Sequence, residues 1–254
     1  MAHFLVNFYS RCLEADTELV VSLPEENRHP LRTLWVLHGA FGDAMGAHNL
    51  ISLQREAGRR GIAVVCPSVY HGFYMDMAHG ERWYTFLSTE LLPWVRSRFL
   101  QLSTRREDNY VLGLSMGGYG AYKWAVNEPE TFSAAGSFSS PLNMKLVMER
   151  LESGKHPGGH DLYDAFGSAA RIAGTRDDML WVLQRLLQSD RPCPKLFQLC
   201  GMEDFAWEEN ELARDAMRAL GAPLTFVSAH GEHTNEFWDQ HLETFLDWLP
   251  KEVE

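Results

Sequence analysis

Short apolar runs rich in β-branched and aromatic residues alternate with helical patterns along almost the whole chain. Two runs near the N-terminus, residues 4–13 and 17–23, lie too close together for a crossover and predict an antiparallel hairpin at a sheet edge. Further runs follow at 33–38, 62–66, 109–113, 134–138, 195–200 and 224–228, and the first three are nearly continuously apolar. Such runs are typical of strands covered on both faces. The alternation predicts an α/β fold, with a mostly parallel central sheet of about eight strands and helices on both faces.

Helical periodicity fills most of the intervals between these runs. It is clearest at residues 50–60, 85–100, 116–127, 207–220 and 235–249. One interval, residues 141–194, is far longer than the 2 to 6 residues usual for a helix-to-strand connection. It opens with a helical pattern near 142–151, crosses a Gly- and His-rich stretch at 153–160, and ends in a helix near 177–188. We expect a helical cap inserted into a single domain spanning residues 1–254.

Composition and charge exclude several classes of protein. Hydrophobic residues make up 45% and charged residues 22%, which are ordinary globular values. The net charge of −11 repels polyanions, so we expect no nucleic-acid partner. No apolar run is long enough to cross a bilayer, and no secretory signal is visible. The four cysteines lack metal-ligand spacing, so we expect reduced thiols, no metal site and a cytoplasmic location. The oligomeric state, a homo-oligomer included, stays open.

The strongest chemical signal is Gly113-Leu114-Ser115-Met116-Gly117, which directly follows a predicted strand and directly precedes a predicted helix. A serine on so sharp a turn needs neighbours without bulk two positions away on either side. Gly113 and Gly117 supply them. This context predicts a nucleophile elbow with Ser115 as the nucleophile.

A serine nucleophile requires a base and an acid that orients the base. Of the eleven histidines, His233 lies on the loop between the last predicted strand and the last helix, so we predict that it is the base. His230, on the same loop, is the alternative. The acid is expected just beyond the preceding strand, where Asp204 is favoured over Glu203. Weaker candidates lie in the insertion: Asp177, Asp178 and Asp190.

Backbone N–H groups are expected to stabilise the oxyanion. One comes from Met116, at the start of a helix whose dipole favours negative charge. The other should come from the loop after the strand at 33–38, with Ala40 or Phe41 as the donor and His38 organising the loop.

Aromatic residues gather beyond the carboxyl end of the strand at 62–66, at the same sheet edge as the predicted nucleophile. Ligands bind at this edge in open α/β sheets. We expect Phe73, Tyr74 and Trp83 to contact the substrate, together with Trp207 after the acid loop. The alternative is that these rings pack over the sheet.

Taken together, these motifs resemble the α/β-hydrolase superfamily, and within it the esterase D group and its tributyrin-esterase-like members. The markers are His38-Gly39 and residues 73–80, 113–121, 231–233 and 237–239. The resemblance implies a serine carboxylesterase acting on small-molecule esters with short acyl chains, acetyl to butyryl. It implies Ser115, Asp204 and His233 as the triad, and neither a metal nor an organic cofactor.

The resemblance leaves the substrate open. It also covers S-formylglutathione hydrolysis and removal of acetyl or feruloyl groups from plant polysaccharides. Where family members often carry a tyrosine in the aromatic loop, this chain has His79. A peptidase with the same triad and a non-catalytic binding protein are further alternatives, since a fold does not fix function. The joint presence of serine, acid, base and oxyanion loop argues against the binding protein.

Overall fold

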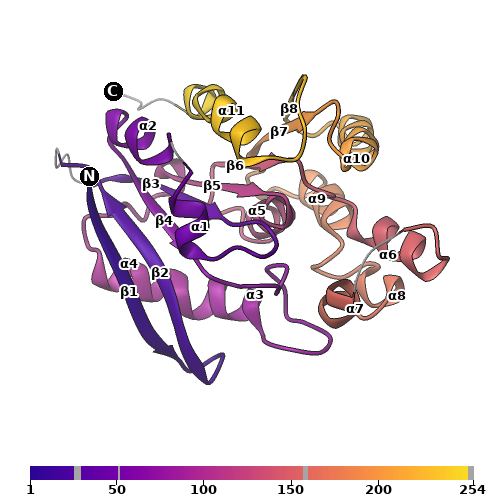
Figure 1. The fold of residues 1–254 in the computed structure, drawn as a ribbon, viewed down its shortest axis with the longest axis horizontal. Coiled ribbons are helices and arrows are strands. Elements are labelled where there is room, and N and C mark those ends of the chain that lie inside the picture. Colours follow the sequence, from indigo (N-terminus) through magenta and orange to yellow (C-terminus); the bar gives the residue numbers. More distant parts are fainter. Residues whose placement is uncertain (26–29, 51, 157–159, 251–254) are drawn as a thin grey trace.

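The computed structural model describes residues 1–25, 30–50, 52–156 and 160–250 (Figure 1). Two predicted segments fall partly outside these ranges. The helix predicted at 50–60 includes Ile51, and the Gly- and His-rich stretch at 153–160 includes 157–159; these residues lie outside the described part of the chain.

A mostly parallel sheet runs through the middle of the molecule. Its strands are β1 (Ala2–Ser10), β2 (Ala15–Leu23), β3 (Arg32–Leu37), β4 (Ile62–Pro67), β5 (Asn109–Leu114), β6 (Ala134–Phe138), β7 (Lys195–Gly201) and β8 (Leu224–Ala229). Among the described residues they form one eight-stranded sheet in the order β1-β2-β4-β3-β5-β6-β7-β8. β2 pairs antiparallel with β1 and β4, and all other neighbours are parallel. The predicted α/β fold and edge hairpin are confirmed.

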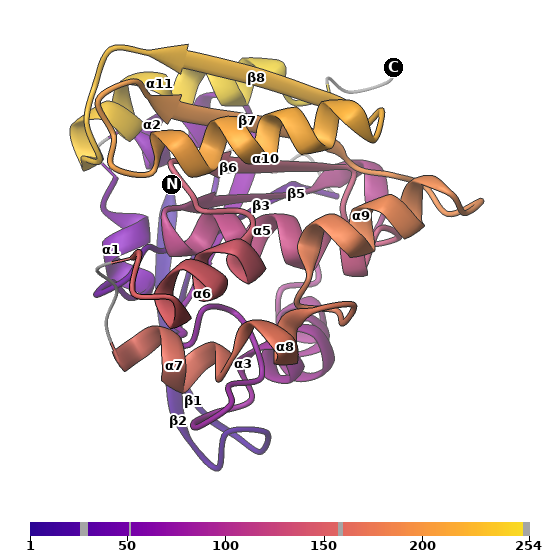
Figure 2. The ribbon, with the colours of Figure 1, turned by 90° about the vertical axis from the view of Figure 1, so that its right-hand side faces the viewer.

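The apolar strands in the middle of the sheet are buried because helices cover both faces (Figures 1 and 2). These helices are α1 (Ala44–His48), α2 (Leu53–Arg59), α3 (Trp83–Thr85), η1 (Phe86–Leu91), α4 (Leu92–Arg98), η2 (Arg106–Asp108), α5 (Met116–Asn127), α10 (Trp207–Ala219) and α11 (Asn235–Trp248). Side chains of one strand alternate between the two cores. On β3, Trp35 packs with residues of α4 and α5, whereas Leu34 and Val36 pack with residues of α2 and α11.

The helix predicted at 85–100 is divided into three parts. α3 leads into the π-helix η1, and α4 follows. Pro93 lies in the first turn of α4. Because proline has no N–H, it cannot bond to the carbonyl four residues earlier, and the wider turn of η1 immediately precedes it.

In the described part of the segment between β6 and β7, the chain forms four helices. They are α6 (Met144–Glu152), α7 (His160–Phe166), α8 (Ala169–Ile172) and α9 (Met179–Leu187). They lie on the side of the sheet that carries α5 (Figure 2). Side-chain caps begin three of them, with Asn143, Ser168 and Asp178 accepting backbone N–H groups. The sequence predicted the first and last of these helices and missed the two short ones between them.

Candidate active site

Ser115 stands on a sharp turn between β5 and α5. Its φ of +53° lies in the left-handed region, and its N–H donates to the Phe138 carbonyl at 2.8 Å. A Cβ atom on Gly113 would strike the backbone of Gly117, and one on Gly117 would strike the Leu37 carbonyl. The turn therefore requires glycine on both sides of the serine, as the motif predicts.

Three side chains from separate loops form one hydrogen-bonded row. His233 Nε2 lies 2.8 Å from Ser115 Oγ, and His233 Nδ1 lies 2.9 Å from each carboxylate oxygen of Asp204. Aromatic rings hold the imidazole: Phe205 lies against one side at a centroid distance of 4.3 Å, and Trp238 meets it edge-on at 5.0 Å. The row brings together the predicted nucleophile, base and acid.

The Asp204 carboxylate is buried and ionised. Burial alone would raise its pKa, but hydrogen bonds from His233, the Ala206 N–H and Ser139 outweigh this effect and lower it. The carboxylate therefore favours a proton on His233 Nδ1, which leaves Nε2 free to accept a proton from the serine.

The alternative base and acid pair with each other. His230 Nδ1 lies 2.8 Å from Glu203 Oε1, and Glu203 Oε2 accepts the Gly231 N–H at 2.6 Å. The His230 side chain is 86% exposed. This pair braces the His233 loop from outside the row.

The carboxylates of the insertion have other partners or surroundings. Asp177 pairs with Lys123 on α5. Asp178 caps α9, and Asp190 is exposed. The structure brings none of the three to the His233 ring.

The loop after β3 passes directly beside Ser115. Gly39 is so close that an added Cβ would lie 3.3 Å from the Ser115 Cβ, and the Gly42 N–H closes a turn on the Gly39 carbonyl. Phe41 in this turn has a φ of +63°. Across the serine, Met116 is the first residue of α5, so its N–H has no acceptor within the helix. Ala40 and Phe41 both remain candidate donors opposite it.

His38 organises this loop as a neutral imidazole. Its Nε2 accepts the Val69 N–H at 3.0 Å, so the proton sits on Nδ1 and is donated to the Gly39 carbonyl at 2.7 Å. Burial lowers the pKa of His38 to about 4. The His38 carbonyl in turn accepts the Tyr74 hydroxyl at 2.9 Å.

A cavity of about 680 Å³ opens beside Ser115. Phe41 and Phe205 stand at it with 84% and 77% of their surfaces exposed. Its lining comes from the loops after β3, β5, β7 and β8, from the end of β5, and from α1 and the first turn of α11. The lining residues are His38, Gly39, Ala40, Phe41, Gly42, Gly46, Ala47, Leu114, Ser115, Phe205, His233, Thr234, Asn235 and Trp238. The sequence analysis did not name Phe205, and it named Trp238 only as one of the residues at 237–239 that mark the family resemblance, although both lie within five positions of a predicted triad residue.

The four aromatic residues expected to contact substrate lie outside this lining, because each packs against another part of the protein. Phe73 packs on Phe166, and Trp207 on Phe226. Tyr74 and Trp83 are buried: the Tyr74 ring lies against Gly120 of α5, and the Trp83 ring lies against Gly72.

Other chemistry is sparse in the part of the chain that the structure describes. It contains no cluster of three or more His, Cys, Asp or Glu residues that could hold a metal ion, and its four cysteines are free. None of its helices combines the length and the apolar character needed to cross a bilayer.

Comparison with known proteins gives consistent matches. The Esterase family model matches residues 10–249. An acetyl esterase of Caldicellulosiruptor saccharolyticus is 26% identical over 264 residues, covering 99% of each chain. Among solved structures, the fluorophosphonate-binding serine hydrolase FphF of Staphylococcus aureus is 28% identical with a TM-score of 0.87, covering 99% of both chains. The S-formylglutathione hydrolase FrmB of the same organism is 28% identical with a TM-score of 0.85, covering 98% of both chains.

Proposed function

The chain belongs to the Esterase family and is a carboxylic ester hydrolase of α/β-hydrolase fold. We propose that it is a serine carboxylesterase and that Ser115, His233 and Asp204 form its triad. The observation that carries the proposal is the unbroken row of hydrogen bonds from the serine through the imidazole to the buried carboxylate.

In this mechanism Ser115 Oγ attacks the ester carbonyl while His233 Nε2 takes its proton. Asp204 stabilises the imidazolium that forms. The N–H of Met116, with that of Ala40 or Phe41, donates to the oxyanion of the tetrahedral intermediate. His233 then protonates the departing alcohol, and a water molecule activated by the same imidazole hydrolyses the acyl-enzyme.

We further propose that the preferred acyl groups run from acetyl to butyryl. Support comes from the acetyl esterase, which is similar to this chain over its full length. Helices α6 to α9 are proposed as a cap within a single domain. They contact the loop at residues 70–83, where the N–H groups of Ala78 and His79 donate to the carbonyls of Ala165 and Asp164, each at 2.8 Å. That loop then forms the link between cap and site.

A second candidate is S-formylglutathione hydrolysis, favoured by the similarity to FrmB. Thioesters and oxygen esters pass through the same oxyanion intermediate, so one triad serves both. A small acyl group on a large, polar thiol would place most of the substrate outside the acyl pocket.

The test combines a nucleophile variant with a substrate series. Ser115→Ala should lower kcat on p-nitrophenyl acetate by about 10⁴-fold or more and abolish labelling by a fluorophosphonate. Ser137, which is also buried, offers the matched control: Ser137→Ala should keep both the label and the activity. Parental activity in Ser115→Ala would refute the triad.

The substrate series measures kcat/KM from acetyl to decanoyl p-nitrophenyl esters below the micellar limit, with S-formylglutathione alongside. Each added methylene that finds apolar surface contributes roughly 0.8 kcal/mol, whereas overfilling a pocket costs about 1 to 3 kcal/mol. A short pocket gives a maximum by butyryl and a clear fall by octanoyl. A rise continuing to decanoyl refutes it, and a much higher kcat/KM for S-formylglutathione would establish the second candidate.

A further inference from the structure

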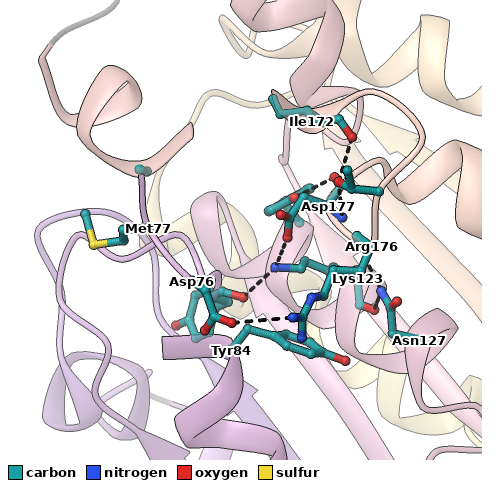
Figure 3. A network of polar contacts seen from close by, with 12 residues as sticks. Asp76, Met77, Tyr84, Lys123, Asn127, Ile172, Arg176 and Asp177 are labelled. Atoms are coloured by element: carbon teal, nitrogen blue, oxygen red, sulfur yellow. Dashed lines mark hydrogen bonds and ion pairs between the residues drawn. The ribbon is translucent and has the colours of Figure 1, made fainter. Parts of the chain in front are cut away.

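One face of α5 is fastened to the segment between α8 and α9. Tyr119, Lys123 and Asn127 are spaced four residues apart and share this face. The Tyr119 hydroxyl donates to the Asp177 carbonyl at 2.7 Å, and the Asn127 amide donates to the Arg176 carbonyl at 3.0 Å. Between them, Lys123 Nζ lies 2.5 Å from Asp177 Oδ1 (Figure 3). The proposed cap is thus anchored to the helix that begins beside the proposed nucleophile.

Lys123 is completely buried, and the mechanism above does not use it. Burial lowers its pKa, and the neighbouring Asp177 carboxylate opposes this effect. Its ammonium group also donates to the Tyr74 carbonyl at 3.1 Å and lies 4.5 Å from the centre of the Tyr84 ring. An amine so far from water is tolerated only with such partners, so its position is closely fixed.

Tyr74 connects this lysine to the oxyanion loop. Its φ of +54° is costly for a residue with a side chain, so the surroundings must hold it. Lys123 binds its carbonyl, and its ring lies against α5 at Gly120. Its hydroxyl donates to the His38 carbonyl at 2.9 Å. The same residue therefore receives a bond from α5 and gives one to the start of the loop beside Ser115.

Building on the proposed function, we propose that Lys123 is a positioning residue, which holds Tyr74 so that its hydroxyl fixes the His38 carbonyl and hence the oxyanion loop. Oxyanion donors act on the transition state, and a small displacement weakens them without weakening substrate binding. Loss of Lys123 is therefore expected to reduce kcat and to leave KM nearly unchanged. Through Asp177, the seating of the proposed cap is coupled to the same loop.

The experiment compares Lys123→Met, Tyr74→Phe and the double variant on p-nitrophenyl acetate, with active sites titrated by a fluorophosphonate. Titration removes any effect of a smaller folded fraction. Each single change should lower kcat about tenfold with KM within about twofold. If both residues act along one path, the kcat of the double variant should be no more than about twofold lower than the kcat of the less active single variant. The proposal would be overturned if the kcat loss in the double variant equalled the product of the two single losses, or if Lys123→Met left kcat unchanged.

Tyr122→Phe is the matched control. Tyr122 adjoins Lys123 on α5 and is equally buried, and its hydroxyl has no hydrogen-bond partner among the described residues, so its removal should leave kcat unchanged. A tenfold loss of kcat in Tyr122→Phe would mean that any disturbance of α5 lowers kcat, and it would overturn the proposal.

A second variant covers the case in which Lys123→Met does not fold. Lys123→Met combined with Asp177→Leu removes both charges, a replacement that buried ion pairs often tolerate. It should show the same kcat loss as the single change. Activity retained in Ser115→Ala would instead refute the proposed function, whereas a labelled Ser115 with a parental kcat in both lysine variants refutes only the role of Lys123.

Discussion

Acidification from pH 7 to pH 4 should destabilise the protein measurably through His38. The residue is 2% exposed, and burial lowers its pKa from 6.5 to about 4. Between these pH values the unfolded chain binds a proton on this ring that the folded protein does not bind. The free energy of unfolding therefore falls as the pH drops below 6.5 and stops falling for this reason near pH 4. At about 1.4 kcal/mol per pH unit, the window corresponds to about 3 kcal/mol.

The assay is urea denaturation at pH 7 and pH 4 for the parent and for His38→Gln. Glutamine does not titrate and retains an oxygen that can accept the Val69 N–H. Carboxylates titrate in both proteins, so their contribution cancels in the comparison. The parent should lose about 3 kcal/mol more than the variant between the two pH values. An excess loss under about 1 kcal/mol would refute the view of His38 as a buried, neutral ring.

Three further substitutions, two of them paired with a control substitution, test the proposed row and its turn. Asp204→Asn should lower kcat about 10³- to 10⁴-fold, because the amide presents a donor to the imidazole and disfavours the required tautomer; Glu203→Gln should cost tenfold at most, and equal losses would refute the assignment. His233→Ala should abolish fluorophosphonate labelling while His230→Ala retains it, and the opposite ranking would identify the other histidine as the base. Gly117→Ala should lower the free energy of unfolding by about 3 kcal/mol, since the new Cβ meets the β3 backbone; a parental melting temperature would contradict this.

The strands and the elbow could be read from the sequence because their signals are local. β4 and β5 are nearly continuous apolar runs, and β6 to β8 are mostly apolar runs with one or two polar residues each. The bounds of all five strands differ from the prediction by one residue at most. The first strand shows where locality fails. It was expected to reach Leu13 but ends at Ser10, since the Glu90 carboxylate captures the N–H groups of Arg11 and Cys12. Because Glu90 is distant in sequence, the residues of the run itself do not indicate where the strand ends.

The pocket and the lysine network could not be read in this way. Tyr74 and Phe205 are both aromatic residues on loops at the same sheet edge, yet one ring is buried under the site and the other is exposed at the cavity. The difference comes from backbone direction and from contacts with Gly120 and His38. In the sequence, Lys123 looks like a solvent-facing helical residue. Its burial is tolerated because distant partners surround the ammonium group: the Asp177 carboxylate, the Tyr74 carbonyl and the Tyr84 ring.

The row of hydrogen bonds joins turns at the ends of three different strands, and its proposed nucleophile and base are 118 residues apart along the chain. Contacts between residues so far apart in sequence cost loop-closure entropy, and folds rich in such contacts form slowly. During synthesis Ser115 leaves the ribosome before His233, so under the proposed mechanism the nascent chain cannot hydrolyse esters until the C-terminal part has emerged. In a refolding experiment, the return of ester hydrolysis is therefore expected to report the moment at which β8 and α11, which flank the His233 loop, have docked on the sheet.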